Sequence, residues 1–406
     1  MPESHLRPTL VYVITHAMSA HTLLRGQLGQ MREYGFDVCL ISGSADGLEQ
    51  VAAHEGIRTF HLEMKRKISP VADLWALLRL VMLLRRLRPE IVNAGTTKAG
   101  LLGMLAAFIA RVPRRIYLLR GLRLETTQGI KRVILWFTEW ISSFCAHSVV
   151  CVSHSLRDRF VAAGLDSHRK TLVLCDGSSN GIDAARFNDT VDNADLSELR
   201  DRVGLLTEAP VIGFVGRLAR DKGIAELCEA YKRLLQVYPQ LQMLLVGDFD
   251  SGDRIPKNVE RELRRHPGVF VTGYLPDPAP YYGLMDVLVF PSHREGFPNV
   301  PMEAAAAGLP VVGFEATGTV DAVRHGETGK LVPLHDVGGL VSAISDYLND
   351  EQLRSQHGKA ARLRILRLFR QDRIWQALRQ AYGIVPTPDT VPDGNDASYP
   401  QRKIAA

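Results

Sequence analysis

Two glutamates flank a turn in the segment SHREGFPNVPMEAAAAGLPVV, residues 292–312, and their spacing could support chemistry. Seven residues separate Glu295 from Glu303, and the alanine-rich stretch after Glu303 predicts a helix. Proline is favoured at the first helical position, so Pro301 indicates where that helix begins. Glu303 then falls in the first turn, where the helix dipole stabilises a carboxylate by about 0.3–1 kcal/mol. Capping alone therefore accounts for Glu303 without any ligand.

Glu295 is different, because it lies in the loop itself, too early to cap the helix. It follows the apolar run DVLVFPS, residues 286–292, at the expected carboxyl end of a strand. Ligands of open parallel sheets bind at that edge. An ionised carboxylate only accepts hydrogen bonds, and the hydroxyl of a sugar can donate one. We therefore interpret Glu295 as a contact to a ligand rich in hydroxyl groups.

A second loop, FVGRLARDKGIAEL, residues 214–227, is rich in positively charged side chains. Gly216 ends the expected strand, Arg217 and Lys222 follow it, and Gly223 stands just before the next helix. Two cations beside a helix N-terminus form a site for an anion such as phosphate. By charge alone, an ordinary basic loop closed by a capping glycine is the favoured explanation.

A third loop, EATGTVDAV, spans residues 315–323. Its small residues, Thr317, Gly318 and Thr319, can present backbone amides to a phosphate. Asp321 is expected to cap the helix that follows. None of the three loops is decisive alone.

The elements that must position these loops alternate along the whole chain. Short β-branched runs and longer helical periods follow one another, which predicts parallel sheets with helices on both faces. The expected strands of the first half are residues 9–16, 36–42, 58–64, 90–94, 114–119 and 147–153. Those of the second half are residues 209–216, 241–247, 268–273, 286–292 and 309–314. The fold class is thus α/β, with two Rossmann-like, doubly wound domains facing each other across a cleft.

The domain boundaries follow from breaks in this alternation. Residues 175–197 are rich in Gly, Ser, Asn and Asp, which is typical of an interdomain connection. The tail is rich in Pro, Asp and Ser, which predicts disorder. We place an N-terminal domain at 1–178, a linker at 179–207, a second domain at 208–365, a terminal helix returning to the first domain at 366–385, and the disordered tail at 386–406.

Together the motifs resemble the retaining glycosyltransferases of family four, in the GT-B group. The match rests on GRLARDKG (216–223), on EGFPNVPMEAAAAGLPVV (295–312) with its Glu-x7-Glu spacing, and on HGETGKLVP (325–333). The stretch at 96–125 is similar to the branch that makes bacterial capsule, O-antigen and exopolysaccharide. The resemblance covers roughly residues 9–380.

This resemblance implies a donor site and an acceptor. The enzyme would move a hexose, N-acetylhexosamine or deoxyhexose from a nucleotide diphosphate sugar, expected to be UDP-linked, to a hydroxyl of an undecaprenyl diphosphate-linked glycan. Arg217 and Lys222 would neutralise the diphosphate, Glu303 would bind the ribose, and Glu295 the hexose. The remaining donor-binding candidates are Gly216, Thr272, Gly296, Phe297, Pro298 and Asn299.

The resemblance also implies the reaction course. Such enzymes retain anomeric configuration, and front-face attack, in which the departing phosphate helps to accept the proton, is the expected route. Glu295 as a covalent nucleophile is a less favoured alternative. No metal and no other cofactor is expected, because protein cations and helix dipoles stabilise the leaving group. The DFD segment at 248–250 is accordingly not expected to hold a metal ion.

The first domain departs from the family pattern. Many relatives carry histidines where this chain has Asn93 and Gly95, and before the glycine at 121. The candidates for acceptor contacts are therefore His16, Ser19, Lys98 and Arg120. For His16, an ordinary polar residue at a strand end is an equally good explanation.

Charge and composition bear on partners and location. The five cysteines show no metal-binding spacing, and the N-terminus has no apolar leader, so a cytoplasmic protein is expected. Residues 1–190 carry a net charge of +8 and residues 191–406 one of −3. The basic half predicts attachment to the anionic inner face of the bacterial inner membrane, although a solvated helix face explains it equally well. Aromatic interleaving and a recognition helix are missing, so nucleic acid is not an expected partner.

Two other functions stay open. One is a GT-B sugar-nucleotide epimerase or phosphorylase; epimerases of this fold lack the GFPN turn, and no cofactor lysine of a phosphorylase can be located. The other is a catalytically silent subunit that holds a nucleotide sugar or a partner transferase. The presence of Arg217, Lys222, Glu295 and Glu303 disfavours a silent subunit.

Overall fold

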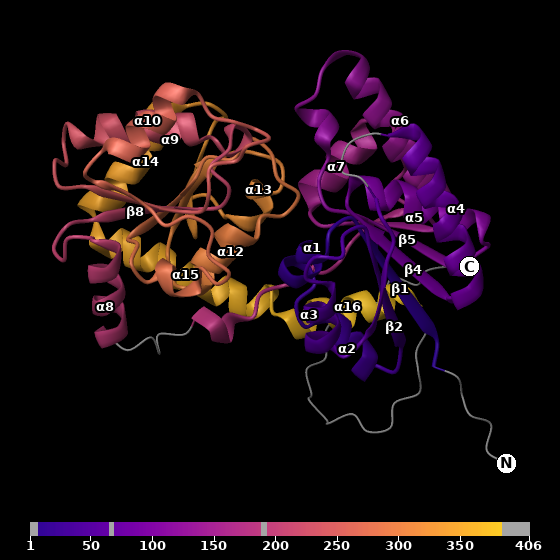
Figure 1. The fold of residues 1–406 in the computed structure, drawn as a ribbon. Helices are drawn as coiled ribbons and strands as arrows, with labels where there is room; N and C mark the ends of the chain where they lie inside the picture. Colours follow the sequence, from indigo (N-terminus) through magenta and orange to yellow (C-terminus); the bar gives the residue numbers. More distant parts are fainter. Residues whose placement is uncertain (1–6, 65–68, 188–192, 384–406) are drawn as a thin grey trace.

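The computed structural model describes residues 7–64, 69–187 and 193–383, and the expected tail at 386–406 lies outside these ranges. Two parallel sheets, each flanked by helices, stand side by side (Figure 1). The α/β class with two doubly wound domains is therefore confirmed.

The first sheet has the order β3-β2-β1-β4-β5-β6-β7, and every neighbouring pair is parallel. Its strands are mostly buried on both faces, which explains their near-continuous apolar runs. The last strand was not expected, because three residues leave too short a pattern to recognise. The strands are β1 (Thr9–Ile14), β2 (Asp37–Ser42), β3 (Arg58–His61), β4 (Ile91–Gly95), β5 (Arg114–Leu119), β6 (Ser148–Cys151) and β7 (Thr171–Val173).

Three long helices form one layer on the first sheet. They are α4 (Pro70–Leu87), α5 (Thr97–Ile109) and α6 (Gly129–Cys145), and α5 packs between the other two (Figure 1). Right-handed crossovers place all three on the same face of the sheet. The remaining helices of this half are α1 (Ala17–Leu23), α2 (Gln27–Glu33), α3 (Leu48–Glu55) and α7 (His154–Ala162), with a 3₁₀ turn at Arg123–Glu125.

The second sheet has the order β10-β9-β8-β11-β12-β13 and is also parallel. The strands are β8 (Val211–Val215), β9 (Gln242–Val246), β10 (Val269–Val271), β11 (Val287–Phe290), β12 (Val311–Phe314) and β13 (Gly329–Val332). The helices are α8 (Asn193–Val203), α9 (Ile224–Leu235), α10 (Lys257–Arg265), α11 (Ala279–Tyr282), α12 (Asn299–Ala306), α13 (Thr319–Ala322) and α14 (Val337–Asn349). Helix α8 lies inside the expected linker, and β13 was not expected from the sequence.

The chain returns to the first domain at its end. Helix α15 (Glu351–Leu368) packs on α12 in the second domain, whereas α16 (Gln371–Tyr382) packs on α2 in the first. Tyr382 is fully buried there, and its hydroxyl lies 2.7 Å from that of Tyr12. The outgoing and returning segments run together, because Ile182 pairs with Arg370. Within the described part of the chain, no helix is both long and apolar enough to cross a bilayer.

Candidate active site

The cationic loop of the second domain follows β8. The strand ends at Val215, one residue before the expected Gly216, and a 3₁₀ turn, Arg220–Lys222, leads into α9. Gly223 between them has φ +69°, and a Cβ on it would lie 2.0 Å from the carbonyl oxygen of Pro291. Only glycine lets this loop lie so close to the end of β11. That approach carries Lys222 to the segment that bears Glu295.

Lys222 and Glu295 are in direct contact. The ammonium group donates a hydrogen bond to the carboxylate, and both side chains are largely buried. The same carboxylate oxygen accepts a hydrogen bond from the Ser292 hydroxyl at 2.6 Å. The backbone N–H of Glu295 donates to the carbonyl oxygen of Thr317 at 3.1 Å, so the third loop, residues 315–323, holds the loop of Glu295 in place. The structure thus joins two of the residues that the motifs single out.

Arg217 is half exposed and pairs with Asp250 of the DFD segment. This hydrogen bond lowers the pKa of Asp250 to about 2. A second carboxylate, Asp221, lies 3.9 Å from the guanidinium. Because a guanidinium has five N–H donors, Arg217 keeps donors for an arriving phosphate. The Asp250 partnership could not be foreseen, because no local pattern links residues 33 positions apart.

The turn between the two glutamates touches the first domain. A Cβ on Gly296 would lie 1.9 Å from the carbonyl oxygen of Arg120. The carbonyl oxygen of Gly296 accepts a hydrogen bond from the Ser153 hydroxyl at 2.7 Å. Phe297 packs against the cores of both domains. Pro298 then precedes α12, which begins at Asn299.

Glu303 has a different environment from the one expected. Helix α12 begins at Asn299 and has no acidic residue in its first turn, so the assignment of Glu303 to that turn was wrong. Proline is tolerated anywhere in the first turn, where N–H groups lack helical partners, so Pro301 did not mark the start. The Tyr282 hydroxyl donates a hydrogen bond of 2.7 Å to the Glu303 carboxylate. Burial raises the pKa of Glu303, and this hydrogen bond offsets part of the increase.

The donor-binding candidate Thr272 directly follows β10. The backbone N–H of Thr272 donates to the carbonyl oxygen of Leu245 at 3.0 Å, and its hydroxyl donates to the carbonyl oxygen of Gly273 at 2.9 Å. Tyr274, two residues further on, is exposed. Thr272 is therefore held by hydrogen bonds to two backbone carbonyl groups, and the exposed ring of Tyr274 follows it two residues later in the sequence.

The candidates of the first domain do not all gather at one point. His16 is exposed at the position before α1, and Ser19 is in that helix. The Lys98 ammonium lies 2.7 Å from the Asp73 carboxylate, which joins α5 to α4. Arg120 donates a hydrogen bond of 2.7 Å to the Ser179 hydroxyl, and burial lowers the pKa of its guanidinium to about 10. The backbone of Arg120 lies against Gly296 in the loop of Glu295.

The third loop joins the two domains. The Asp321 carboxylate accepts hydrogen bonds from the backbone N–H groups of His154 and Ser155, at 3.1 and 3.3 Å, at the start of α7. The expectation that Asp321 caps the next helix was therefore wrong, since it caps a helix of the other domain. The Thr317 hydroxyl donates to Glu125 at 2.9 Å across the same boundary. Each of these partners is more than 160 residues away in sequence, which is why sequence patterns could not identify them.

Two family models together match most of the chain. The family model described as glycosyl transferase 4-like domain matches residues 20–175, and the model described as glycosyl transferases group 1 matches residues 209–350. The capsular polysaccharide biosynthesis glycosyltransferase CapM of Staphylococcus aureus is 38% identical over 89% of this chain and 93% of its own. An Escherichia coli UDP-Gal:alpha-D-GlcNAc-diphosphoundecaprenol alpha-1,3-galactosyltransferase is 26% identical over 78% of this chain and 81% of its own.

Solved structures share the fold. The crystal structure of Anabaena HepE in complex with UDP-glucose superposes with a TM-score of 0.79 at 22% identity, covering 93% of this chain and 99% of that one. Sucrose-phosphate synthase from Thermosynechococcus elongatus has a TM-score of 0.75 at 22% identity, covering 93% and 98%. These likenesses show the two-domain fold.

Proposed function

Because this chain belongs to the group 1 and 4-like glycosyl transferases, we propose that it transfers a sugar from a UDP-linked donor to an undecaprenyl diphosphate-linked glycan in bacterial surface polysaccharide synthesis. The names of the S. aureus and E. coli relatives support the pathway, the donor class and the lipid carrier. Transfer to a hydroxyl with retention of configuration, and without a metal ion in the chemical step, completes the proposal.

The observation that carries the proposal is the contact of Lys222 with Glu295 at the carboxyl edge of the second sheet, against the first domain. Lys222 and Arg217 would neutralise the charge that develops on the departing diphosphate. Glu295 would orient the sugar through a hydroxyl, and Glu303 would hold the ribose hydroxyls. Each carboxylate retains free acceptor positions beside its present partner.

The transfer exchanges one bond of the anomeric carbon for another. The acceptor oxygen forms a bond to the anomeric carbon on the face from which the carbon–oxygen bond to the diphosphate breaks. The acceptor proton passes to a phosphate oxygen of the departing nucleoside diphosphate. Lys222 and Arg217 supply the positive charge that stabilises the diphosphate as it leaves. We assign the acceptor contact of the first domain to Arg120, whose backbone touches Gly296.

An exposed apolar surface of the first domain is the observation behind the proposed membrane attachment. Helix α6 buries Glu139, Ser142, Ser143 and Cys145 against the sheet. Its outward side instead exposes large apolar residues, and α4, on the other side of α5, exposes another set. We call this surface the α4–α6 face, made of Val71, Leu74, Trp75, Leu78 and Met82 of α4 and of Ile130, Val133, Ile134, Phe137, Trp140 and Phe144 of α6.

An anionic bilayer is the occupant that best fits the α4–α6 face. A soluble surface seldom exposes so large an apolar patch without a partner. Tryptophan and phenylalanine suit the boundary between headgroups and acyl chains. Exposed cations border the patch, namely Arg79, Arg85 and Arg86 on α4 and Lys131 and Arg132 on α6, and these attract anionic headgroups. Peripheral attachment through this face is part of the proposal.

Acceptor-dependent release of UDP tests the proposed function. Full-length protein is incubated with a panel of UDP-sugars, with and without a synthetic undecaprenyl diphosphate-linked sugar, in parallel reactions with and without EDTA. We expect UDP and an extended lipid-linked product only when both substrates are present. An epimerase would convert the donor sugar without acceptor, and a silent subunit would bind the donor without turnover, so either result would overturn the proposal.

Substitution of Lys222 connects the activity to the site. Lys222→Ala should lower kcat by about 10²–10³-fold, the usual effect of removing one stabilising group from a developing anion. Arg220→Ala is the matched control, because it removes a cation from the same 3₁₀ turn. Equal losses in the two variants would contradict the role assigned to Lys222.

A further inference from the structure

Three side chains with metal-binding atoms converge beside the candidate active site. Glu226 lies in the first turn of α9, His293 follows β11, and His335 follows β13. One carboxylate oxygen of Glu226 lies 2.8 Å from Nε2 of His293 and 3.0 Å from Nδ1 of His335. The ligand atoms of all three residues lie within 4.8 Å of one another. Three separate loops therefore bring an oxygen and two nitrogens to one point.

We propose that Glu226, His293 and His335 form a binding site for one divalent transition-metal ion of the Zn²⁺ type, with a fourth position open to water. This site goes beyond the proposed transfer reaction, which assigns no role to a metal.

The ligand set and its dimensions support this class of ion. Two imidazoles and one carboxylate are a common set for zinc with an open position, whereas Mg²⁺ and Ca²⁺ prefer oxygen ligands. Bonds of about 2.0–2.1 Å in a tetrahedron separate neighbouring ligand atoms by about 3.3 Å. The observed 2.8 and 3.0 Å need to lengthen by only a few tenths of an ångström.

The surroundings hold the ligands in place. The side chains of Glu226 and His293 are 18% and 19% exposed, whereas His335 is 62% exposed. The two imidazole rings stand 4.5 Å apart, and each lies 6.1 Å from the ring of Phe314.

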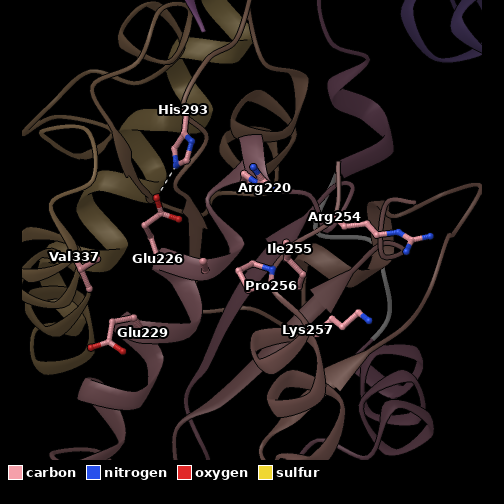
Figure 2. Close-up of a pocket in the computed structure, with 10 residues that line it drawn as sticks. Arg220, Glu226, Glu229, Arg254, Ile255, Pro256, Lys257, His293 and Val337 are labelled. Carbon is pink, nitrogen blue, oxygen red and sulfur yellow. Dashed lines mark hydrogen bonds and ion pairs between the residues drawn. The ribbon is translucent and has the colours of Figure 1, made fainter. Parts of the chain in front are cut away.

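A cavity gives access to this point. Glu226 and His293 line a cavity of about 730 Å³ that also includes Arg220, Arg254 and Lys257 (Figure 2). In Figure 2 the carboxylate of Glu226 points toward His293, while the charged ends of Arg254 and Lys257 point away from both. Repulsion of an incoming cation by these two groups is therefore reduced.

The position of the site indicates what the ion would do. Glu226 lies four residues after Lys222, and His293 lies two residues before Glu295. An ion that joins Glu226 to His293 would tie together the two loops that carry the Lys222–Glu295 contact. Its role is therefore positioning, and the charge on the leaving diphosphate is still met by Lys222 and Arg217.

Zinc binding to tag-free, chelator-treated full-length protein tests the site. Equilibrium dialysis against Zn²⁺ should give one equivalent bound with micromolar or tighter affinity, and Mg²⁺ should not compete. His335→Gly is the informative variant, because φ +66° at this position favours glycine and the backbone can keep its conformation. We expect at least a tenfold loss of Zn²⁺ affinity in His335→Gly and none in His168→Ala, an exposed histidine of the other domain.

A second readout makes the result independent of activity. Co²⁺ bound to two imidazoles and a carboxylate should give visible absorption bands in the wild type that disappear in His335→Gly. Absence of zinc binding in the wild type, or equal binding by His335→Gly, would overturn the proposal. The acceptor-dependent assay measures turnover with and without EDTA, whereas dialysis and Co²⁺ absorption measure metal binding, so a failure of the metal site and a failure of the proposed function are separate results.

Discussion

At the scale of single residues, Glu303 illustrates how one carboxylate can have two explanations. Its place in the second turn of α12 removes the capping explanation, and its hydrogen bond with Tyr282 holds the carboxylate in one orientation. A half-buried carboxylate with one ordered partner and free acceptor positions suits a pair of ribose hydroxyls. That role remains a prediction.

We expect Glu303→Gln to weaken UDP binding by about 10- to 100-fold, because hydrogen bonds to a charged acceptor contribute roughly 1.5–3 kcal/mol. Isothermal titration calorimetry with UDP measures the change. Since burial raises the pKa of Glu303, the wild type should also lose affinity on acidification as its carboxylate is protonated, and Glu303→Gln should not. Exposed Glu327→Gln is the control, and equal affinities for UDP in all three proteins would refute the ribose contact.

Glu139 provides a test of stability against pH. It is 3% exposed, and burial raises its pKa to about 7, with a hydrogen bond from Tyr117 lowering it in part. Between its usual value near 4.5 and about 7 the folded state holds a proton that the unfolded state has lost, so stability falls as pH rises through this window.

The Glu139→Gln variant isolates this effect. From pH 5 to pH 8 the wild type should lose on the order of 3 kcal/mol relative to Glu139→Gln, since one pKa unit corresponds to about 1.36 kcal/mol. Melting temperatures of both proteins at the two pH values measure it. If both melting temperatures change in parallel, Glu139 is not the titrating group.

At the scale of elements, α6 is unusual because its side toward the sheet carries Glu139, Ser142 and Ser143 and its outward side is aromatic and aliphatic. Packing within this chain alone gives no reason for that pattern, because exposed apolar surface costs roughly 25 cal/mol per Å². The rings of Trp140 and Phe144 stack 5.6 Å apart, which presents them as one apolar surface. We attribute the pattern to the proposed bilayer contact.

Vesicles of phosphatidylethanolamine and phosphatidylglycerol test the α4–α6 face. The triple variant Trp75→Ser, Phe137→Ser and Trp140→Ser should bind at least tenfold more weakly in flotation assays, since each large apolar side chain contributes about 1.5–3 kcal/mol when buried. The control is Leu363→Ser with Leu366→Ser, two exposed leucines of α15 in the other domain. Unchanged vesicle binding would contradict the proposal, as would a wild-type dimer that the triple variant abolishes without any vesicle binding.

At the scale of the whole molecule, the two domains meet through the same loops that carry the candidate site. Gly296 lies against Arg120, and Asp321 caps α7 across the boundary. The chain passes from the first domain to the second near Ile182 and returns near Arg370. Because these two residues pair, we expect the hinge between the domains at this point. We therefore expect the candidate site to be assembled when the two domains close on each other.

Gly296→Ala should separate the domains. Its Cβ would lie 1.9 Å from the Arg120 carbonyl oxygen, a distance that only a backbone shift can relieve. We expect a larger radius of gyration by small-angle scattering and a loss of turnover of about 10²-fold, because small misplacements of reacting groups have effects of that size. Gly338→Ala on α14, where the nearest atom is 3.4 Å from the new Cβ, is the control. An unchanged radius together with unchanged turnover would contradict this role of Gly296.

The class of fold, most strands and the loops that carry Arg217, Lys222, Glu295 and Glu303 could be predicted because each depends on local properties. Apolar periodicity identifies strands and helices, and glycine and proline mark the turns between them. The short strands β7 and β13 and the start of α12 were missed, because short runs and first-turn prolines leave weak local signals. The family resemblance rested on the same local motifs, and the family models match the corresponding regions.

What the tertiary structure decided is which of these residues meet. Lys222 contacts Glu295 across 73 positions, Glu226 meets His335 across 109, and Asp321 meets Ser155 across 166. No local pattern encodes such pairs, since they arise from strand order and from the angle at which two domains pack. The outward side of α6 is a similar case, because its helical periodicity shows an apolar side but not whether that side faces the sheet or the solvent.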